Sequence, residues 1–313
     1  MSDKLRVGVV GVGYLGKFHA RIYSEMEGVD LVGVVDSDAA VAESIAAEYN
    51  TRAYTDFRDL LDKVDAVNIV VPTSYHLDVA RPFLERGIHM LMEKPIATTV
   101  EEGEQLVALA EKAGCIFQVG HLERYNSGLR ALIDRMQGKP SFIEVHRLGT
   151  FVERATDVDV ITDLMIHDID IVGALMGVPA VKVDASGAHV LTDHIDIANA
   201  RIEFEGGAVA NVTASRVSNK RFRRIRVFGS KQYYSLDFAE QRLEVVTAGD
   251  IDPETGRPSI TQEKLDIEPQ PPLDAELADF IDAVRNKRPP LVDGRTGLEA
   301  LRMAFKIKES IGL

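Results

Sequence analysis

The sequence of 313 residues contains a single cysteine, Cys115, and fewer basic than acidic side chains. One cysteine excludes an internal disulfide and a cysteine-rich zinc site, which favours a reducing compartment and no bound metal. Lysine and arginine total 36 against 49 aspartate and glutamate residues, a net charge of −13. This balance disfavours nucleic acid or an anionic membrane surface as a partner, and small molecules remain as the expected ligands.

Long apolar runs are missing as well. No stretch reaches the roughly 18 consecutive apolar residues that a membrane helix needs. Residues 1–4 lead directly into an apolar strand pattern, without the features of a secretory signal. We therefore expect a soluble, cytoplasmic protein with about two domains, at roughly 150 residues per domain.

The first 120 residues alternate short apolar, β-branched runs with helical patterns. Continuous apolar strands separated by helices are typical of a parallel sheet that is covered on both faces. The pattern predicts an α/β fold, a doubly wound Rossmann domain over residues 1–122. The expected strands are 5–10, 31–35, 66–71, 89–92 and 115–119, and the expected helices lie near 16–26, 39–48, 75–86 and 100–113.

Beyond His121 the rhythm changes to strands that follow one another with glycine turns. This pattern indicates a second, α+β domain over residues 123–313 with an antiparallel sheet. The last two helices are amphipathic and could also pack back on the Rossmann domain. The expected strands are 142–148, 197–204, 208–215, 223–228 and 233–238, and the helices lie near 125–136, 161–176, 274–286 and 296–311, the last two after a proline-rich linker at 268–272.

A G-x-G-x-x-G motif follows the first strand and opens a helix. Gly11 permits the tight turn, Gly13 lets the backbone approach a pyrophosphate, and Gly16 allows close packing of helix on strand. The N–H groups at the start of that helix can bind phosphates. Asp36 ends the second strand 20 residues after Gly16, where a carboxylate can bind ribose hydroxyls. A dinucleotide site is therefore predicted.

The residues around Asp36 also distinguish between two cofactors. The segment Asp36-Ser37-Asp38-Ala39-Ala40 contains no arginine or lysine that could hold a 2′-phosphate. We therefore predict NAD rather than NADP.

Two further clusters carry chemistry. Glu93-Lys94-Pro95 follows a predicted strand, at the sheet edge where α/β proteins bind their ligands. Asp163 and His167 are four residues apart on a predicted helix and share a face, which Asp170 continues. Polar residues on such an apolar helix cost free energy on burial unless they have partners or a function.

At this point the sequence resembles the glucose–fructose oxidoreductase, inositol dehydrogenase and rhizopine-catabolism (Gfo/Idh/MocA) family. The resemblance covers nearly the whole chain and implies a Rossmann domain followed by a domain with an open, mainly antiparallel sheet. It also implies a nicotinamide cofactor and the oxidation or reduction of a secondary alcohol on a sugar or cyclitol. The motifs that carry it are 11–16, Val71-Pro72-Thr73 with His76, 93–95, 163–167, 276–280 and 297–301.

By this resemblance Lys94, His167 and Asp163 are the catalytic residues. Lys94 would contact the reacting hydroxyl and stabilise negative charge on its oxygen. His167 is the preferred general base because its reference pKa of ~6.5 suits neutral pH, and Asp163 would orient the substrate or the imidazole. The residues expected to bind the cofactor are Gly11, Gly13, Tyr14, Leu15, Gly16, Asp36, Ser37, Pro72, Thr73, His76, Glu93 and Lys94.

A narrower resemblance runs through residues 120–126 and 165–171, to the branch that acts on nucleotide-linked N-acetylhexosamines, including UDP-N-acetylglucosamine 3-dehydrogenases. Such enzymes form a 3-keto sugar that a partner aminotransferase can aminate, as in lipid A biosynthesis. A UDP substrate needs cations, and Arg124 or the basic run Lys220–Arg224 with Arg216 could supply them, although the run is also typical of a solvated strand edge. The residues expected to bind substrate are Lys94, His121, Arg124, Tyr125, Asn126, Asp163 and His167.

Three other functions remain open at this stage. The first is a dehydrogenase of a free sugar or cyclitol. The second is an NAD-dependent glycosidase of the same superfamily, which oxidises C3 only transiently. The third is a non-catalytic, dinucleotide-sensing regulator. In each case we expect a homodimer or homotetramer formed through the second sheet, because an open sheet usually finds a partner.

Overall fold

The computed structural model describes residues 4–151 and 158–313. Their contacts divide the chain into two compact units. Unit 1 contains Met1–Leu122 and Pro271–Leu301, and unit 2 contains Glu123–Gln270 and Arg302–Leu313. The chain thus first passes into unit 2 after Leu122. Residues 271–301 belong to unit 1. The sequence analysis assigns them to the second domain, with packing of the last two helices on the Rossmann domain as the alternative.

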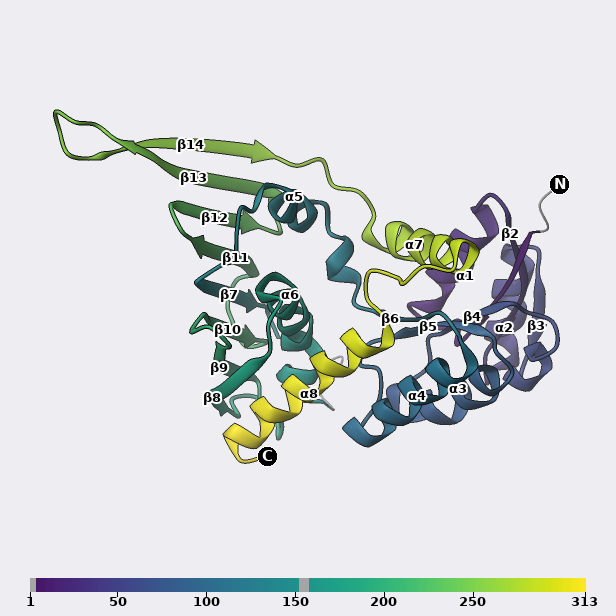
Figure 1. Cartoon of the computed structure of the whole chain (residues 1–313). Helices are drawn as coiled ribbons and strands as arrows, with labels where there is room; N and C mark the ends of the chain where they lie inside the picture. The colour runs from purple at the N-terminus through teal and green to yellow at the C-terminus, as the bar shows by residue number, and fades with distance from the viewer. Residues whose placement is uncertain (1–3, 152–157) are drawn as a thin grey trace. The chain divides into compact units, whose positions relative to one another are not determined.

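Unit 1 is built on a parallel sheet of six strands in the order β3-β2-β1-β4-β5-β6 (Figure 1). The predicted doubly wound sheet is confirmed, and the strand order reverses between β1 and β4, where such folds bind nucleotides. The strands are β1 (Leu5–Val10), β2 (Val29–Val35), β3 (Arg52–Tyr54), β4 (Ala66–Ile69), β5 (His89–Glu93) and β6 (Phe117–Gly120). The helices between them are α1 (Gly16–Glu25), α2 (Ala39–Glu48), α3 (His76–Glu85) and α4 (Val100–Ala113), with 3-10 turns at Phe57–Leu60, Thr73–Tyr75 and Leu122–Tyr125.

The late helix α7 (Pro272–Asn286) completes the core of unit 1. Its residues Leu277, Phe280, Ile281 and Val284 are buried at helical spacing and join the apolar cluster of β1, β2 and α1. Burying one such side chain stabilises a fold by about 1.5–3 kcal/mol. This apolar face explains why residues 271–301 leave unit 2, although they follow it in the sequence.

Unit 2 contains a mainly antiparallel sheet of eight strands in the order β14-β13-β12-β11-β7-β10-β9-β8 (Figure 1). The predicted sheet is confirmed, with one parallel pair, β7 and β10, near its centre. Its strands are β7 (Phe142–Leu148), β8 (Ala180–Ala188), β9 (Ile197–Phe204), β10 (Val209–Ser215), β11 (Phe222–Gly229), β12 (Gln232–Asp237), β13 (Arg242–Ile251) and β14 (Pro258–Asp266). The helices of this unit are α5 (Ser127–Arg135) and α6 (Ile166–Met176), the second preceded by a π-helical turn, Ile161–Met165.

The strands of unit 2 alternate between two faces. Ile143 and Val145 on β7 are buried together with Ile225 and Val227 on β11, on the face that α6 contacts. The alternate residues, such as Phe142 and its partner Phe228, are only partly buried. One face is therefore packed, and the other keeps accessible side chains.

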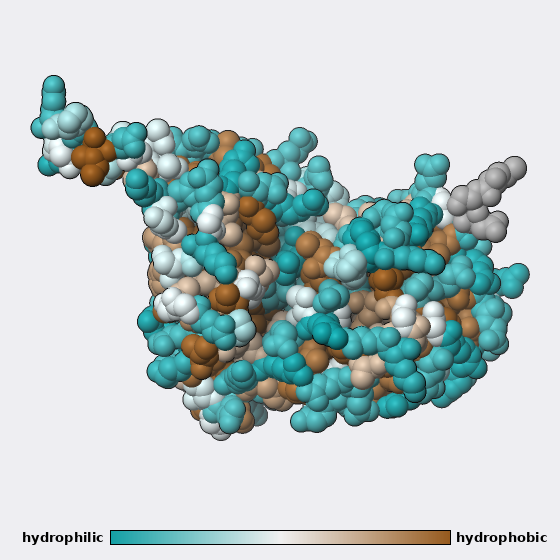
Figure 2. All heavy atoms as spheres, in the orientation of Figure 1, coloured by the Kyte–Doolittle hydropathy of each residue, from teal (hydrophilic) through white to brown (hydrophobic). Residues whose placement is uncertain are grey.

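The hairpin of β13 and β14 was not foreseen in full from the sequence. It extends beyond the neighbouring strand β12 (Figure 1), and nearly all of β14 is exposed. Without a buried face, β14 shows no alternation of apolar and polar residues, which is the signal that predicts strands. Near the tip of the hairpin, Ile251 of β13 and Ile260 of β14 are 68% and 70% exposed, and Figure 2 shows apolar atoms there.

The last helix, α8 (Gly294–Ile311), begins in unit 1 and ends in unit 2. Among the described residues, no helix has both the length and the apolar character needed to cross a bilayer.

Candidate functional site

The glycine motif forms the turn between β1 and α1 in unit 1. Gly11 has a φ of +86°, and a Cβ there would lie 2.4 Å from the carbonyl oxygen of Val70. At Gly16 a Cβ would lie 1.8 Å from the carbonyl oxygen of Gly11, so neither position accepts a side chain. These contacts explain two of the three glycines by backbone packing alone.

The third glycine and the helix that follows indicate what this turn can hold. A Cβ at Gly13 would meet no atom within 4 Å, so its backbone faces open space. Leu15, at the N-cap of α1, provides no side-chain hydrogen bond to the first turn, whereas Asp38 caps α2 and Thr99 caps α4. Free N–H groups and the positive end of a helix dipole are what a pyrophosphate requires. The turn therefore fits the phosphates of a dinucleotide.

Asp36 lies beside this turn. Its Oδ2 accepts the main-chain N–H of Val12 at 3.0 Å, and its Oδ1 accepts that of Asp38 at 3.1 Å. The carboxylate is thus fixed at the end of β2, next to the glycine turn, while Ser37 is exposed. Each oxygen keeps a lone pair for the hydroxyls of a ribose.

The variant Asp36→Ala is expected to lose its preference for NAD. Hydrogen bonds to a charged group contribute about 1.5–3 kcal/mol, so the KM for NAD should rise roughly tenfold to a hundredfold. The KM for NADP should not rise, because the carboxylate no longer repels a 2′-phosphate. Steady-state kinetics with both cofactors measure this. Asp38→Ala is the matched control, since Asp38 only caps α2, and a wild-type preference for NADP would contradict the assignment.

The other predicted cofactor residues lie at the same edge of the sheet, after β1 and after β4. Tyr14 and Leu15, in the turn after β1, are exposed. Pro72 and Thr73, after β4, form the 3-10 turn that leads into α3. His76 is buried behind them, with Nδ1 at 3.3 Å from the carbonyl oxygen of Ile96 and Nε2 at 3.1 Å from that of Val71. Burial lowers the pKa of His76. Its imidazole therefore joins the two loops that follow β4 and β5.

Glu93 and Lys94 stand at the end of β5, as predicted. The Glu93 side chain is only 16% exposed, and its carboxylate accepts the N–H of Lys94 at 3.3 Å and lies 3.3 Å from Nε2 of His19. Burial raises the pKa of Glu93, but the hydrogen bonds from His19 and from the main-chain N–H of Lys94, together with the charge of Lys94, outweigh it and hold the pKa below its usual value. Lys94 therefore has the ionised carboxylate of Glu93 at its main-chain N–H.

In unit 2 the predicted helix over 161–176 begins with a π-helical turn, a feature frequent at functional sites. Asp159 caps it by accepting the N–H groups of Ile161 and Thr162 at 3.0 and 2.9 Å, and it also binds Lys308 at 2.8 Å. Asp163 lies in this turn and His167 in the first turn of α6, both partly buried.

Several neighbouring polar residues have partners within unit 2. Asp170 is buried and pairs with Arg124 at 3.2 Å, so it does not continue a free polar face and it compensates the charge of Arg124. Asn126 caps α5 through the N–H groups of Gly128 and Leu129. Tyr125 is 3% exposed, and in unit 1 His121 is fully buried. These contacts give Arg124, Tyr125 and Asn126 structural roles, and their role in binding substrate stays a prediction.

A cavity of about 580 Å³ opens beside Asp163 within unit 2. Arg223 extends from β11 into its wall, stacks on the ring of Phe238 at 4.0 Å, and pairs with Glu123. Its Nε and Nη2 are buried and have no hydrogen-bond partner among the described residues. Burial and the charge of Arg147 lower the pKa of Arg223, against the opposing charges of Glu123 and Asp168. Its lining includes Arg147, Asp163, Leu164, Arg216, Arg221, Phe222, Arg223 and Phe238.

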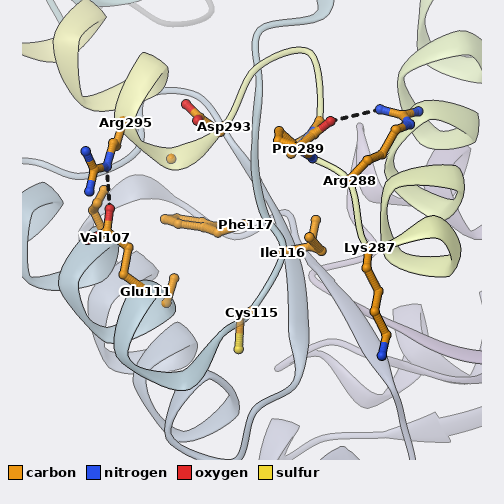
Figure 3. A pocket seen from close by; sticks show the side chains of 13 residues that line it. Val107, Glu111, Cys115, Ile116, Phe117, Lys287, Arg288, Pro289, Asp293 and Arg295 are labelled. Atoms are coloured by element: carbon orange, nitrogen blue, oxygen red, sulfur yellow. Dashed lines mark hydrogen bonds and ion pairs between the residues drawn. The ribbon is translucent and has the colours of Figure 1, made fainter.

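A second cavity, of about 270 Å³, lies in unit 1 at the beginning of β6 (Figure 3). This is the sheet edge opposite the glycine turn, because all six strands are parallel. Its arginines are already paired, Arg295 with Glu111 and Arg288 with Asp279 at 2.6 Å. We therefore do not assign the cofactor to it. The described residues also hold no group of three or more metal-ligating side chains.

The predicted site residues fall into two sets. Lys94 belongs to unit 1, with the glycine turn and Asp36, whereas Asp163 and His167 belong to unit 2. Phe222 of the cavity lies in the basic run 220–224 that the sequence marks as a candidate, whereas Phe238 of the cavity and His19 beside Glu93 are marked by no local motif. A Rossmann sheet with a phosphate-binding turn and a lysine at the same edge, linked to an α+β unit, defines a two-domain, nicotinamide-dependent oxidoreductase.

Comparison with known proteins gives the family. Residues 5–121 match the oxidoreductase family with an NAD-binding Rossmann fold, and residues 131–235 match the GFO/IDH/MocA C-terminal domain. The chain therefore belongs to the GFO/IDH/MocA family of oxidoreductases, and its Rossmann domain is an NAD-binding one.

Individual relatives cover different shares of the chain. This chain is 38% identical to UDP-N-acetylglucosamine 3-dehydrogenase from Acidithiobacillus ferrooxidans, over 98% of its own length and 97% of that protein. A solved structure of that enzyme has a TM-score of 0.91, with 98% of each chain covered. Inositol 2-dehydrogenase from Corynebacterium glutamicum is 34% identical over 59% of this chain and 58% of its own length. Levoglucosan dehydrogenase, at 19% identity and a TM-score of 0.85, shares the fold.

Proposed function

We propose that the protein oxidises the C3 hydroxyl of a UDP-N-acetylhexosamine to a ketone, with NAD as the oxidant. The observation that carries the proposal is the cavity of unit 2, which combines the exposed Arg221 with two phenylalanine rings beside Asp163. A 38% identical relative that spans the whole chain is named for this activity. An inositol has neither a phosphate nor a base, so it would leave these groups without partners.

The cavity suits the nucleotide part of such a substrate. Arginine forks bind phosphate oxygens with two parallel hydrogen bonds. The guanidinium of Arg223 is buried behind this wall, so Arg221 is the cation that a diphosphate can reach. Phe222 lies at the same wall and offers a ring on which a base can stack. Arg221, which is exposed at this wall, replaces Arg124 as the preferred cation, because Arg124 is paired with Asp170.

The chemistry follows from three side chains. When bound, NAD accepts the hydride that leaves the sugar carbon. His167 takes the proton of the hydroxyl, since breaking the C–H bond as hydride requires that this proton leaves. Lys94 donates to the same oxygen and stabilises the negative charge that develops on it before the carbonyl forms. Asp163 orients the sugar or the imidazole from the wall of the cavity.

The test uses a labelled substrate. UDP-N-acetylglucosamine with deuterium at C3 should transfer that deuterium to NAD, and mass spectrometry should show a 3-keto sugar, or a 3-amino sugar when a glutamate-dependent aminotransferase is added. In Arg221→Ala the KM for this substrate should rise about tenfold, because a charged hydrogen bond is lost, while the KM for NAD stays unchanged. Release of free N-acetylglucosamine indicates the glycosidase, and oxidation of inositol alone indicates a cyclitol dehydrogenase. Binding of NAD with no turnover of any sugar indicates the regulator.

The proposal includes a homodimer or homotetramer formed through the sheet of unit 2. Its partly exposed face carries an aromatic cluster of Phe142, Phe228 and Tyr233, with ring centroids 5.5 and 4.9 Å apart. The cluster lies beside the turn between β11 and β12, and accessible aromatic residues on a sheet face are typical of an interface. We further propose that the enzyme works in the cytoplasm, with an aminotransferase that consumes its product.

The variant Phe228→Glu is expected to be monomeric, because it places a charge in the aromatic cluster. Sedimentation velocity compares it with the wild type, for which we expect a dimer or tetramer. Ile260→Glu near the end of the β13–β14 hairpin is the matched control and should keep the wild-type assembly. A monomeric wild type would overturn the proposal.

A further inference from the structure

A chain of buried polar side chains runs behind Glu93 in unit 1. The hydroxyl of Tyr23 donates to Oδ1 of Asn68 at 2.9 Å, and Nδ2 of Asn68 lies 2.8 Å from Nδ1 of His19. Tyr23, Asn68 and His19, which we term the buried relay, are at most 1% exposed. They come from α1 and β4, so packing of the helix on the sheet aligns them. Buried polar groups cost free energy unless they are hydrogen-bonded, and each of these three side chains is hydrogen-bonded to the next.

The relay has a defined direction. Because Tyr23 donates to the oxygen of the Asn68 amide, the NH2 group of that amide faces His19. An amide N–H can only donate, so Nδ1 of His19 is the acceptor and the ring proton is on Nε2. Nε2 lies 3.3 Å from Oε1 of Glu93. The relay therefore ends with a donor that is aimed at a carboxylate.

Glu93 is confined between this donor and Lys94. A Cβ at Gly120 would lie 3.1 Å from Oε2 of Glu93, so the carboxylate rests against the backbone of β6. The remaining hydrogen bond at that oxygen comes from the main-chain N–H of Lys94. The charged and titratable groups that interact electrostatically with Glu93 are His19 on α1, His76 on α3, Glu276 on α7 and Lys94 itself.

Glu276 is the other acid of this cluster. It is fully buried on α7, and neither carboxyl oxygen has a hydrogen-bond partner among the described residues. Burial and the negative charge of Glu93 raise the pKa of Glu276 well above its usual value. Two nearby buried carboxyls do not both ionise. Because the relay donates to Glu93, the negative charge is on Glu93 and the proton stays on Glu276.

We propose that the buried relay holds Glu93 as a carboxylate behind Lys94, and that Glu93, through the main-chain N–H of Lys94, positions this lysine for the reaction. The assignment rests on the proposed role of Lys94. It makes Glu93 a positioning residue, because its effect on the reaction is exerted through Lys94. A carboxylate fixed in this way holds the lysine where it can stabilise the substrate oxygen, while the hydroxyl proton goes to His167.

The first test measures protonation and needs no substrate. Infrared difference spectra of wild type against Glu276→Gln at neutral pH should show the band of one protonated carboxyl that the variant lacks. Long-range nitrogen–proton NMR of labelled histidine should show the His19 proton on Nε2. A carboxylate band at Glu276, or a proton on Nδ1 of His19, would overturn the proposal whatever the substrate is.

The second test measures NAD reduction with UDP-N-acetylglucosamine. Glu93→Gln and His19→Leu should lower kcat on the order of a hundredfold, as a displaced catalytic group does, while the KM for the sugar changes little. His19→Gln, whose amide can accept from Asn68 and donate to Glu93, should recover most of the activity. Glu276→Gln keeps the shape and neutrality of the acid and should retain wild-type kcat.

The outcomes separate this proposal from the proposed function. If UDP-N-acetylglucosamine is not oxidised by the wild type, the function fails, and the spectroscopic test still decides whether the charge is on Glu93. If the wild type is active and Glu93→Gln keeps its kcat, Glu93 does not position Lys94. If Glu276→Gln lowers kcat as much as Glu93→Gln does, the negative charge is not confined to Glu93, and the proposal is also overturned.

Discussion

Replacing Lys94 by alanine is expected to lower kcat with UDP-N-acetylglucosamine by about 10²–10³-fold. Removing one donor that stabilises a developing oxyanion has an effect of this size. The affinity for NAD should stay close to that of the wild type, because the glycine turn and Asp36 hold the dinucleotide without the ammonium group. Initial rates of NADH formation and a fluorescence titration of NADH binding measure the two quantities separately.

The control for this variant is a lysine of the same unit. Lys112 is in the last turn of α4, at the opposite edge of the sheet, and is exposed. Lys112→Ala should keep both kcat and the affinity for NADH. If Lys94→Ala retains turnover, the lysine has no part in the mechanism. If it loses NADH binding instead, the residue serves the cofactor rather than the reacting oxygen.

The parallel sheet of unit 1 could be predicted because its signals are local. The strands over 5–10 and 66–71 are continuous apolar runs, and the glycine motif fixes the turn after the first of them. Asp36 follows the second strand at a distance that the fold dictates. For these residues, short-range sequence pattern and long-range structure agree, so the cofactor site could be located before the fold was known.

The assignment of α7 to unit 1 could not be predicted in this way. Its amphipathic pattern indicates a helix but does not identify the surface that the apolar face covers. Phe280 and Leu277 would fit either sheet by composition, and only the packing against β1, β2 and α1 decides. The exposed strand β14 was missed for the opposite reason, because it buries no face whose pattern could be detected.

In the candidate site, too, local contacts could be predicted from the sequence and long-range contacts could not. Asn126 precedes a helix and has the residue type of an N-cap, so its capping of α5 could have been found from local sequence. The partners of Arg124 and Arg147 could not, because each pairing joins segments far apart in the chain. The charge of an arginine is visible in the sequence, but whether a buried carboxylate already compensates it depends on the fold.

Removing Arg147 is expected to cause the largest loss of stability in unit 2. Its guanidinium binds Asp168 through two hydrogen bonds of 2.7 and 2.8 Å and Glu123 through one of 3.3 Å, and Asp168 is fully buried. Glu123 keeps a second cation, Arg223, whereas Arg147 is the only ion-pair partner of Asp168 among the described residues. Arg147→Met therefore leaves a carboxylate buried without a counter-charge, which costs about 3–5 kcal/mol.

A double variant tests whether the unpaired charge causes the loss. Replacing both partners, as in Arg147→Met with Asp168→Leu, removes the two charges together and should recover most of the free energy of unfolding. The midpoint of urea unfolding at neutral pH measures all three proteins. A single variant as stable as the wild type would show that the ion pair contributes no net stability, and a double variant less stable than the single one would show that packing, not charge, decides.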